Sequence, residues 1–481
     1  MISLHLYTFV ATVLLLASTV AAVPLPDDFT IENLMRTVDL TKTYSRETIS
    51  LILKSKASTP VSSFYWSLNT SLVDEAQPGP KLSIFDVKRK GGDGTIPLTV
   101  LAPSNSVIEG ISILKIDFDE AIFPGETATI SIASARVFSS FAQPSKIKQG
   151  EAQVLVWDGG RSIITPYTVV KQRTKVRVAD RPPTGYSRDG DDPKVDGNTL
   201  TYGPYSDVPP MTSMPIRVKY EYNKPMIVVD KLERELWVSH TGGNLATEEN
   251  YWLHNGVADL SDQFSRIRWQ ASVMTNEKIS AIKEIPIQLR PGARDVYFTD
   301  EIGNVSTSHF NALSREPLLQ ISPRYPVFGG WNYSFTLGWN HDVGRSLRQS
   351  ILPKEDGTVE DVYILRVPLI EGPENAVYKK VDVSVVLPEG AEIEQVSSTY
   401  TNLTESRSLR KSHLDAKGRP VVTLSASSLV DEHRKHELYV IYKYSNEQAY
   451  AKPLLVASAV GAIFLAFIVL TRMDTSISKT A

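Results

Sequence analysis

Apolar and polar residues alternate along most of this chain, and this pattern constrains the fold more than any other feature. Residues 216–222 read IRVKYEY, residues 380–387 read KVDVSVVL, and residues 114–119 read LKIDFD. A period of two residues is typical of half-buried antiparallel strands, whereas helical periodicity is scarce before the C-terminal region. The sequence therefore predicts a mainly β protein with two tandem antiparallel β-sandwich-like domains.

One segment departs from this pattern. Residues 454–471 read LLVASAVGAIFLAFIVLT and carry no charge over 18 residues. At about 1.5 Å per residue the run spans roughly 27 Å, close to the hydrocarbon core of a thin bilayer. A buried helix of a soluble protein is the alternative, but such helices rarely lack polar residues on every face. We expect residues 453–471 to form one C-terminal transmembrane helix.

The N-terminus predicts entry into a secretory compartment. An apolar run ends at the small residues Ala21 and Ala22, which is typical of a cleaved signal peptide over residues 1–22. A signal anchor that stays attached is the alternative, because residues 1–5 contain no Lys or Arg. Cleavage predicts a single-pass type I protein with its bulk in the lumen and a short cytosolic tail, residues 472–481.

Four Asn-X-Ser/Thr triplets all fall in the predicted luminal part. We rank Asn304 first as a glycosylation site, because its polar surroundings and Gly303 are typical of an exposed loop. Asn69 and Asn402 follow, and Asn332 is last because the aromatic residues around it predict burial in a strand.

The luminal part is long enough for more than one domain. Residues 180–215 are rich in Pro, Gly and Asp, which predicts an excursion or linker rather than a central strand. We place the boundary near Asn223-Lys224-Pro225, which gives luminal β-rich domains at 23–224 and 225–452. Pro124-Gly125 predicts a hairpin between the flanking strands. No internal repeat is evident in the sequence.

Composition and motifs argue against an independent enzyme. Cysteine is absent, which excludes disulfides, thiolate metal sites and cysteine nucleophiles, and the formal charge of −3 argues against nucleic-acid binding. No phosphate loop, nucleophile elbow or zinc-protease helix occurs. The sequence predicts neither a cofactor nor a metal.

Three polar motifs could still carry chemistry, and for each a structural role is favoured. The pairs Asp117/Asp119 and Asp189/Asp191 have the spacing of a glycosyltransferase metal motif. The first pair lies on the solvent face of a strand, and the second lacks a calcium-loop pattern. The HRKH stretch at 433–436 has a spacing that suits a metal on a helix, but a solvated charged segment is favoured.

Aromatic residues cluster in two places. Residues 328–339 combine a Phe-Gly-Gly-Trp motif with alternating aromatics, which favours a strand entering the core over a sugar-stacking platform. Tyrosines at 439, 442, 444 and 450 precede the membrane segment and fit either an interfacial belt or the core of the last strand.

Several stretches, in order and spacing, resemble the ribophorin I family, the alpha subunit of the eukaryotic oligosaccharyltransferase complex. The resemblance runs from about residue 203 to the C-terminus and is looser before residue 200. It rests on the stretches Asp300–His309, Trp237–His240, Gln263–Arg266, Pro326–Trp331, Leu387–Ala391, Tyr202–Pro209, Gly418–Val421 and Arg472–Lys479. The chain ends soon after Lys479, which is similar to the short fungal form and unlike the long-tailed animal form.

The resemblance implies a function that the residues alone do not. The complex transfers a preassembled glycan from dolichyl diphosphate to Asn in Asn-X-Ser/Thr of nascent polypeptides in the endoplasmic reticulum. Catalysis belongs to a multi-spanning subunit with a Trp-Trp-Asp-Tyr-Gly motif, and this chain has no Trp-Trp pair. The resemblance thus implies a non-catalytic membrane subunit whose partners are the other subunits, nascent polypeptides and the protein translocon.

Other functions remain open at this point. A luminal lectin or chaperone-like membrane protein is the main alternative, and a free-standing glycosyltransferase or hydrolase is the third. In all cases small residues on the membrane segment predict close packing against a partner helix. These residues are Ala457, Ser458, Gly461, Ala462 and Ala466.

Overall fold

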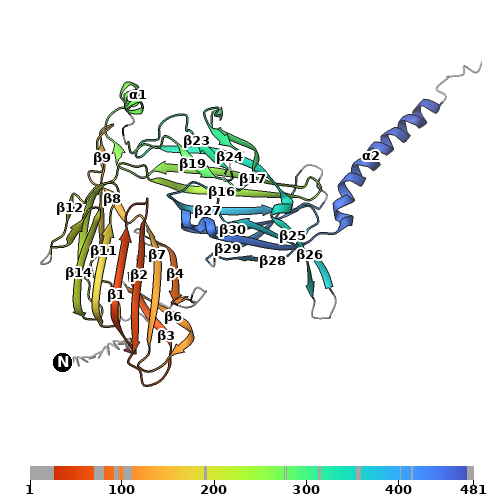
Figure 1. Cartoon of the computed structure of the whole chain (residues 1–481). Helices are drawn as coiled ribbons and strands as arrows, with labels where there is room; N and C mark the ends of the chain where they lie inside the picture. The colour runs from red at the N-terminus through yellow and green to blue at the C-terminus, as the bar shows by residue number, and fades with distance from the viewer. Residues whose placement is uncertain are drawn as a thin grey trace, which may run out of the picture.

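The computed structural model describes the chain from residue 27 to residue 473, with gaps. The gaps are residues 70–80, 91–95, 97, 101–110, 189–191, 276, 278, 313–314, 316, 354–358, 401, 413–414 and 416. The predicted signal peptide and cytosolic tail lie outside the described residues. Figure 1 shows a mostly β body of two parts, from which one long helix projects.

The first part is built on a large mixed sheet covered by two smaller sheets. The large sheet has the order β13 (Lys194–Asp196), β14 (Thr199–Val208), β11 (Val169–Arg177), β1 (Phe29–Asp39), β2 (Ser45–Ser55), β7 (Thr127–Val137) and β4 (Lys81–Arg89). One smaller sheet has the order β3 (Val61–Asn69), β6 (Ile111–Ile122) and β5 (Leu98–Val100). The other has the order β12 (Gly185–Tyr186), β15 (Pro215–Glu221), β10 (Val154–Gly160) and β8 (Ser140–Ala142).

The second part has the same plan. Its large sheet has the order β21 (Gly303–Asn304), β20 (Arg294–Asp300), β24 (Asn332–Asp342), β17 (Asn244–Asn255), β16 (Ile227–Ser239), β27 (Ala376–Val386), β30 (Arg419–Val430) and β29 (Thr404–Arg410). One smaller sheet has the order β19 (Ile285–Gln288), β23 (Leu318–Ile321) and β22 (His309–Asn311). The other has the order β25 (Leu347–Pro353), β26 (Val359–Pro368), β31 (Glu437–Lys443) and β28 (Glu392–Ser398).

The two parts repeat one topology strand by strand. Reading the first large sheet from β13 to β4 and the second from β29 to β20 gives the same succession, with β1 and β16 at equivalent places. Each large sheet has one parallel pair, β1 with β11 and β16 with β27, while its other pairs are antiparallel. The smaller sheets correspond in the same way. The mainly β fold is confirmed, and the repeat and the parallel pairs are features that the sequence did not reveal.

A buried ion pair recurs at the matching place in each part. On β1 and β2, Arg36 Nη2 donates to Glu47 Oε1 at 2.7 Å, and both residues are buried. On β16 and β17, buried Arg234 binds Glu249 and also Glu371, which in turn accepts from Arg290 at 2.7 Å. These charges are paired in the core, where an unpaired charge is costly.

The apolar faces of the strands meet in the core of each part, as alternation predicts. Every second residue of β15, from Ile216 to Tyr220, is buried, and the same holds for β27 from Val381 to Val385. At about 25 cal/mol per Å² of apolar surface removed from water, such cores supply the main stabilising term.

Polar contacts at two places dock the parts against each other. At one, Tyr44 Oη donates to Asp431 Oδ1 at 2.5 Å, and the Thr43 amide donates to Asn375 Oδ1 at 2.8 Å. At the other, β18 (Asp259–Leu260) pairs with β9 (Lys146–Ile147) of the first part. Asp431 begins the short 3₁₀ helix η4 (Asp431–Lys435), and a second such helix, η3 (Val343–Arg345), follows β24.

Two sequence expectations about strand connections are wrong. The strands on either side of Pro124-Gly125 do not form a hairpin, because β6 and β7 belong to different sheets whose apolar faces meet in one core. The expectation that residues 180–215 hold no central strand is also wrong, because β14 pairs with β11 on one side and with β13 on the other. A bulge opposite Gln172/Thr174 accommodates Gly203-Pro204, where proline has no amide hydrogen for the ladder.

The expectation that the HRKH segment is solvated is wrong as well. His433 is fully buried in η4 and packs edge-on against Tyr400, with ring centres 5.0 Å apart. Lys435 Nζ lies 3.6 Å from Asp86 of the first part. The segment belongs to the junction between the parts, because Asp431 and Glu432, the two residues just before it, bind Tyr44 and Arg46 of the first part.

Candidate functional site

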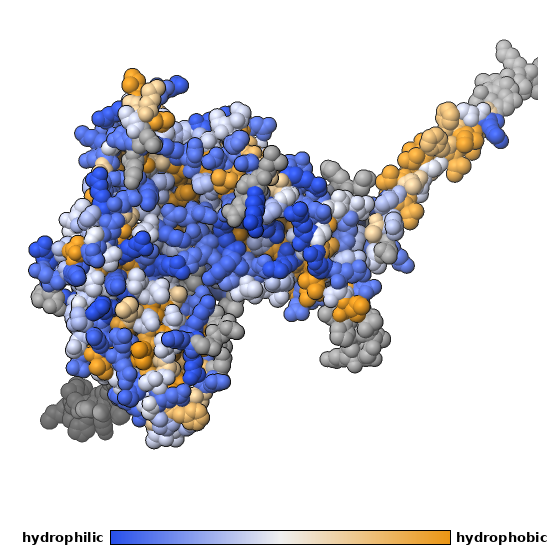
Figure 2. Space-filling model, viewed as in Figure 1, coloured by the Kyte–Doolittle hydropathy of each residue, from blue (hydrophilic) through white to orange (hydrophobic). Residues whose placement is uncertain are grey.

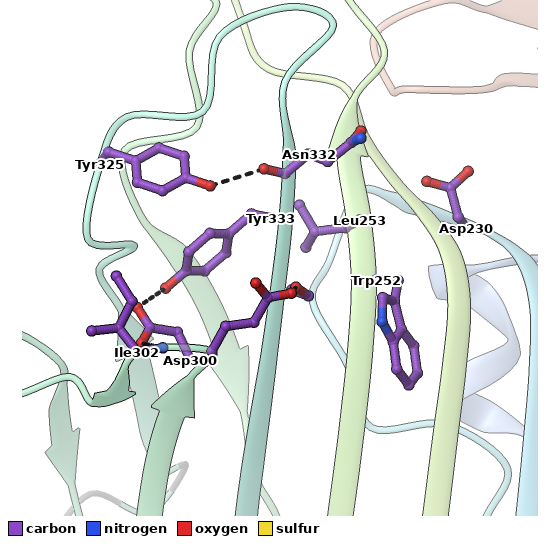
Figure 3. Close-up of a pocket in the computed structure, with 10 residues that line it drawn as sticks. Asp230, Trp252, Leu253, Asp300, Ile302, Tyr325, Asn332 and Tyr333 are labelled. Atoms are coloured by element: carbon purple, nitrogen blue, oxygen red, sulfur yellow. Dashed lines mark hydrogen bonds between the residues drawn. The ribbon is translucent and has the colours of Figure 1, made fainter.

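An aromatic and acidic pocket lies on the large sheet of the second part (Figure 3). Its volume is about 370 Å³, and residues of β16, β17 and β24 line it together with the end of β20, the turn after β20 and the loop before β24. Two large aromatic side chains, Trp252 and Tyr325, are each 41% exposed here. The lining residues are Asp230, Trp252, Leu253, Asp300, Glu301, Ile302, Tyr325, Asn332, Tyr333 and Ser334.

The carboxylates of this pocket are already engaged. Asp300 accepts hydrogen bonds from Arg324 Nε at 2.7 Å and from the Ile302 and Gly303 amides at 3.0 Å. The Arg324 hydrogen bonds, ahead of the backbone amides, hold the pKa of Asp300 at about 2. Asp300 is therefore ionised at neutral pH and unsuited to donating a proton.

The other two acids are held by neighbours. Asp230 accepts from Lys379 Nζ at 2.6 Å and contacts His254 Nδ1 at 2.6 Å. Glu301 Oε1 accepts from Ser334 Oγ at 2.6 Å. Exposed aromatic rings beside fixed polar groups form a surface that suits binding of a sugar or a polypeptide more than acid–base chemistry.

The aromatic cluster predicted for the core, residues 328–339, is buried except for Trp331. Phe328 and, on β24, Tyr333, Phe335 and Trp339 are buried, as expected. Trp331 remains partly exposed, and its ring centre lies 6.1 Å from that of Tyr325, a pocket residue that precedes the cluster. The sequence did not single out Trp252, because its alternating context on β17 is that of an ordinary strand.

Three of the four sequon asparagines are exposed in the described part of the chain. Asn304 is exposed, as predicted, but it lies on the short strand β21 rather than in a loop, and Asn402 is exposed just before β29. Asn69 ends β3, and its side chain lies outside the described part. The expected burial of Asn332 is wrong: it begins β24, but alternation points it to the surface while Tyr333 is buried. Glycan attachment at all four stays a prediction.

The catalytic alternatives find no support in the described residues. Asp117 on β6 pairs with Lys115 Nζ at 2.7 Å. The side chain of Asp119 and residues Asp189 and Asp191 lie outside the described part. Among the residues that were placed, no group of three His, Asp or Glu side chains could hold a metal.

The C-terminal helix α2 (Asn446–Arg472) is the second functional element. It begins seven residues before the predicted membrane segment, at a capping box in which Ser445 and Gln448 bond reciprocally. Its 27 residues span about 40 Å, and it is the one described helix that is long and apolar enough to cross a membrane. Tyr442, which the sequence left between belt and core, is fully buried on β31, whereas Tyr450 on α2 is exposed.

The base of α2 is clamped to the β body. Lys452 Nζ binds Asp415, and it lies 3.2 Å from Glu389 Oε2. The predicted packing residues lie farther along the helix, where Ser458 Oγ donates to Leu455 O of the same helix at 2.8 Å. A Cβ added at Gly461 would meet nothing within 4 Å, and Ala457, Ser458, Ala462 and Ala466 are all exposed.

These features define a β-rich protein with two topologically repeated parts and one apolar helix fit to anchor them in a membrane. The chain belongs to the Ribophorin I family, whose profile matches residues 29–471.

Named relatives agree over most of the chain. It is 31% identical to dolichyl-diphosphooligosaccharide–protein glycosyltransferase subunit 1A of Arabidopsis thaliana, over 97% of this chain and 74% of that protein. It is 30% identical to subunit 1B of Oryza sativa, over 95% of this chain and 94% of that protein. A solved M1 zinc metallopeptidase from Deinococcus radiodurans overlaps 44% of each chain at 14% identity, but its TM-score of 0.24 is too low to bear on fold or function.

Proposed function

We propose that this chain is a non-catalytic subunit of the oligosaccharyltransferase complex in the endoplasmic reticulum membrane. The observation that carries the proposal is the family match over residues 29–471, together with relatives named as subunit 1 of that enzyme. The complex transfers a preassembled glycan from dolichyl diphosphate to Asn in nascent polypeptides. This subunit supports assembly and handles the acceptor polypeptide.

The engaged carboxylates support the non-catalytic part of the proposal. A glycan transferase needs a group free to activate the acceptor amide or hold a metal. Asp300 and Asp230 are instead paired with Arg324 and Lys379, respectively. Partners for this subunit are the multi-spanning catalytic subunit, other subunits, nascent polypeptides and the protein translocon.

The proposed topology is a single pass of type I. In this arrangement α2 crosses the membrane, with a luminal domain 1 ending near residue 224 and a luminal domain 2 over 225–452. The repeated topology supports that boundary, because β15 ends the first repeat at Glu221 and β16 begins the second at Ile227.

Affinity purification tests this function. The tagged full chain is solubilised in mild detergent, and co-eluting proteins are identified. We expect the other subunits in constant proportion to the chain. Elution of the chain alone, with the rest of the complex intact elsewhere, would contradict the proposal.

The pocket supports a second candidate, a luminal lectin. Trp252 offers a partly exposed indole for stacking on a sugar, beside acceptor groups at Asp230 and Glu301. Titration of the full chain in detergent with chitobiose, followed by tryptophan fluorescence, distinguishes the two. Saturable binding that is lost in Trp252→Ala favours the lectin, and its absence favours the assembly subunit alone.

A further inference from the structure

Helix α1 (Arg266–Met274) carries an apolar stripe on its outer face. Ile267, Ala271 and Met274 recur at i, i+4 and i+7, so they lie on one side of the helix. Ile267 is 81% exposed and Met274 is 87% exposed. Helices of soluble domains turn such a stripe toward the core, whereas this one faces away from it.

Comparison of the two repeats shows that α1 lies in an insertion. In the first repeat, residues 56–60 alone connect β2 to β3. In the second repeat, the equivalent connection between β17 and β19 runs over residues 256–284 and contains β18 and α1. The fold of a repeat therefore does not require α1, and the exposed stripe is an addition specific to the second part.

The inner side of α1 is fixed firmly, so the stripe is presented by a rigid support. The Trp269 ring packs edge-on against Phe328, with centres 5.7 Å apart, and Ser272 is buried. At the N-terminal end, Ser265 caps the helix and exchanges two hydrogen bonds with Gln149 of the first part, at 2.9 and 3.1 Å.

The chemistry around the stripe matches a lipid surface. Arg266 and Arg268 are exposed on the helix, which contains no acidic residue. Phe264, just before the helix, and Trp269, within it, are partly exposed aromatic residues. Lys283 Nζ lies 5.3 Å from the Trp269 ring centre. Basic, aromatic and aliphatic side chains together are typical of helices that lie in the membrane interface.

The position of α1 fits the same surface. Figure 1 shows α1 projecting from the body on the side toward which α2 rises. Figure 2 shows hydrophobic side chains at the tip formed by α1 and along α2, while the face of the body between them is largely hydrophilic. Because α2 tethers the body, a weak contact suffices: the tether converts surface binding into an intramolecular step at high effective concentration.

We propose that α1 docks on the lipid surface of the membrane that α2 crosses, and that this second contact fixes the tilt of the body over the bilayer. The inference rests on the proposed membrane crossing by α2. The stripe enters the boundary between headgroups and acyl chains, and Arg266 and Arg268 contact lipid phosphates.

The absence of cysteine makes a direct test possible, because a single introduced thiol can carry a fluorescent probe. The full chain is labelled at Met274→Cys and reconstituted in phosphatidylcholine vesicles, with and without phosphatidylserine. Lipids carry a nitroxide quencher either at the headgroup or deep in the acyl chain. Leu409→Cys on β29, whose side chain is 60% exposed, is the control, and Ile463→Cys reports crossing by α2.

We expect the Met274 probe to be quenched several-fold more strongly than the Leu409 probe, and more by the shallow nitroxide than by the deep one. Arg266→Glu with Arg268→Glu should reduce this quenching, most in vesicles with phosphatidylserine. Equal, weak quenching at Met274 and Leu409, with strong deep quenching at Ile463, would overturn docking but not membrane anchoring. Lack of quenching at Ile463 would overturn the anchoring itself. Protection of Met274 only when other subunits are present would identify a protein partner and also overturn the proposal.

Discussion

At the scale of single residues, buried charges hold the core of each repeat. Arg234 is fully buried and binds two carboxylates, Glu249 and Glu371. Removing it leaves acids in the core without their main cation, which costs about 3–5 kcal/mol. We therefore expect Arg234→Ala to lower the free energy of unfolding by that amount, measured by urea titration in detergent.

The matched control is Arg366→Ala. Arg366 binds Glu437 at 2.6 Å, but its side chain is 62% exposed, and exposed pairs contribute about 0–1 kcal/mol. Equal losses for the two variants would contradict a structural role for the Arg234 network.

A second residue-scale prediction concerns acid sensitivity at the junction of the repeats. Burial lowers the pKa of His433 to about 4. The folded state thus binds the proton less readily than the unfolded state, whose histidine has a pKa near 6.5. Stability should fall as pH drops from about 6.5 toward 4, at up to about 1.4 kcal/mol per pH unit from this group.

The His433→Gln variant cannot take up that proton. Its stability at pH 7 is expected to be lower, because the imidazole also accepts from the Val430 amide at 3.1 Å. Its decline between pH 6.5 and 4 should be shallower than that of the unchanged protein. Parallel pH profiles of the two proteins would show that His433 does not titrate in this way.

At the scale of elements, close backbone packing explains why glycine occupies position 329, in the Gly-Gly pair before β24. A Cβ at Gly329 would lie 1.8 Å from the carbonyl oxygen of Ala258, the residue just before β18. With any larger residue at 329, the loop before β24 could not pack against this backbone. We expect Gly329→Ala to lower the free energy of unfolding by about 1–3 kcal/mol or more. Gly185→Ala is the control, since its nearest neighbour would be at 3.7 Å, and its effect should stay within about 0.5 kcal/mol.

The membrane helix offers the second element-scale prediction. Small residues let helices approach closely in lipid, where the hydrophobic effect gives little drive. Gly461→Leu or Ala462→Leu should therefore weaken co-purification of partner subunits. A Cβ added at Gly461 would meet nothing within 4 Å and Ala462 is exposed, so insertion and folding of the subunit should not change. Unaltered assembly in both variants would contradict packing through this face.

Sequence patterns located individual strands better than they predicted which strands pair with each other. Alternation located β6, β15 and β27, because the period of two depends only on which side faces the core. It could not predict that β6 and β7 enter different sheets, since a turn at Pro124-Gly125 suits a hairpin and an arch equally. Exposure of Asn304 was predictable from local polarity, whereas the exposure of Asn332 depends on its register against His254 on β17.

At the scale of the whole molecule, two copies of one topology are docked and carried on a clamped helix. The repeat was hidden because equivalent strands share a pattern but not a sequence. The pocket around Trp252 was hidden for a related reason: its lining comes from segments far apart in the chain, which only the fold brings together. The family resemblance therefore predicted function where local chemistry could not.

The central claim is that this chain supports glycan transfer without performing it. Transfer from a dolichyl diphosphate donor to an Asn-X-Thr peptide, measured for the purified complex and for the chain stripped of its partners, tests the claim most directly. We predict transfer only in fractions that contain the multi-spanning subunit, with the isolated chain at background. Transfer by the isolated chain, or a fully active complex that lacks it, would contradict the account.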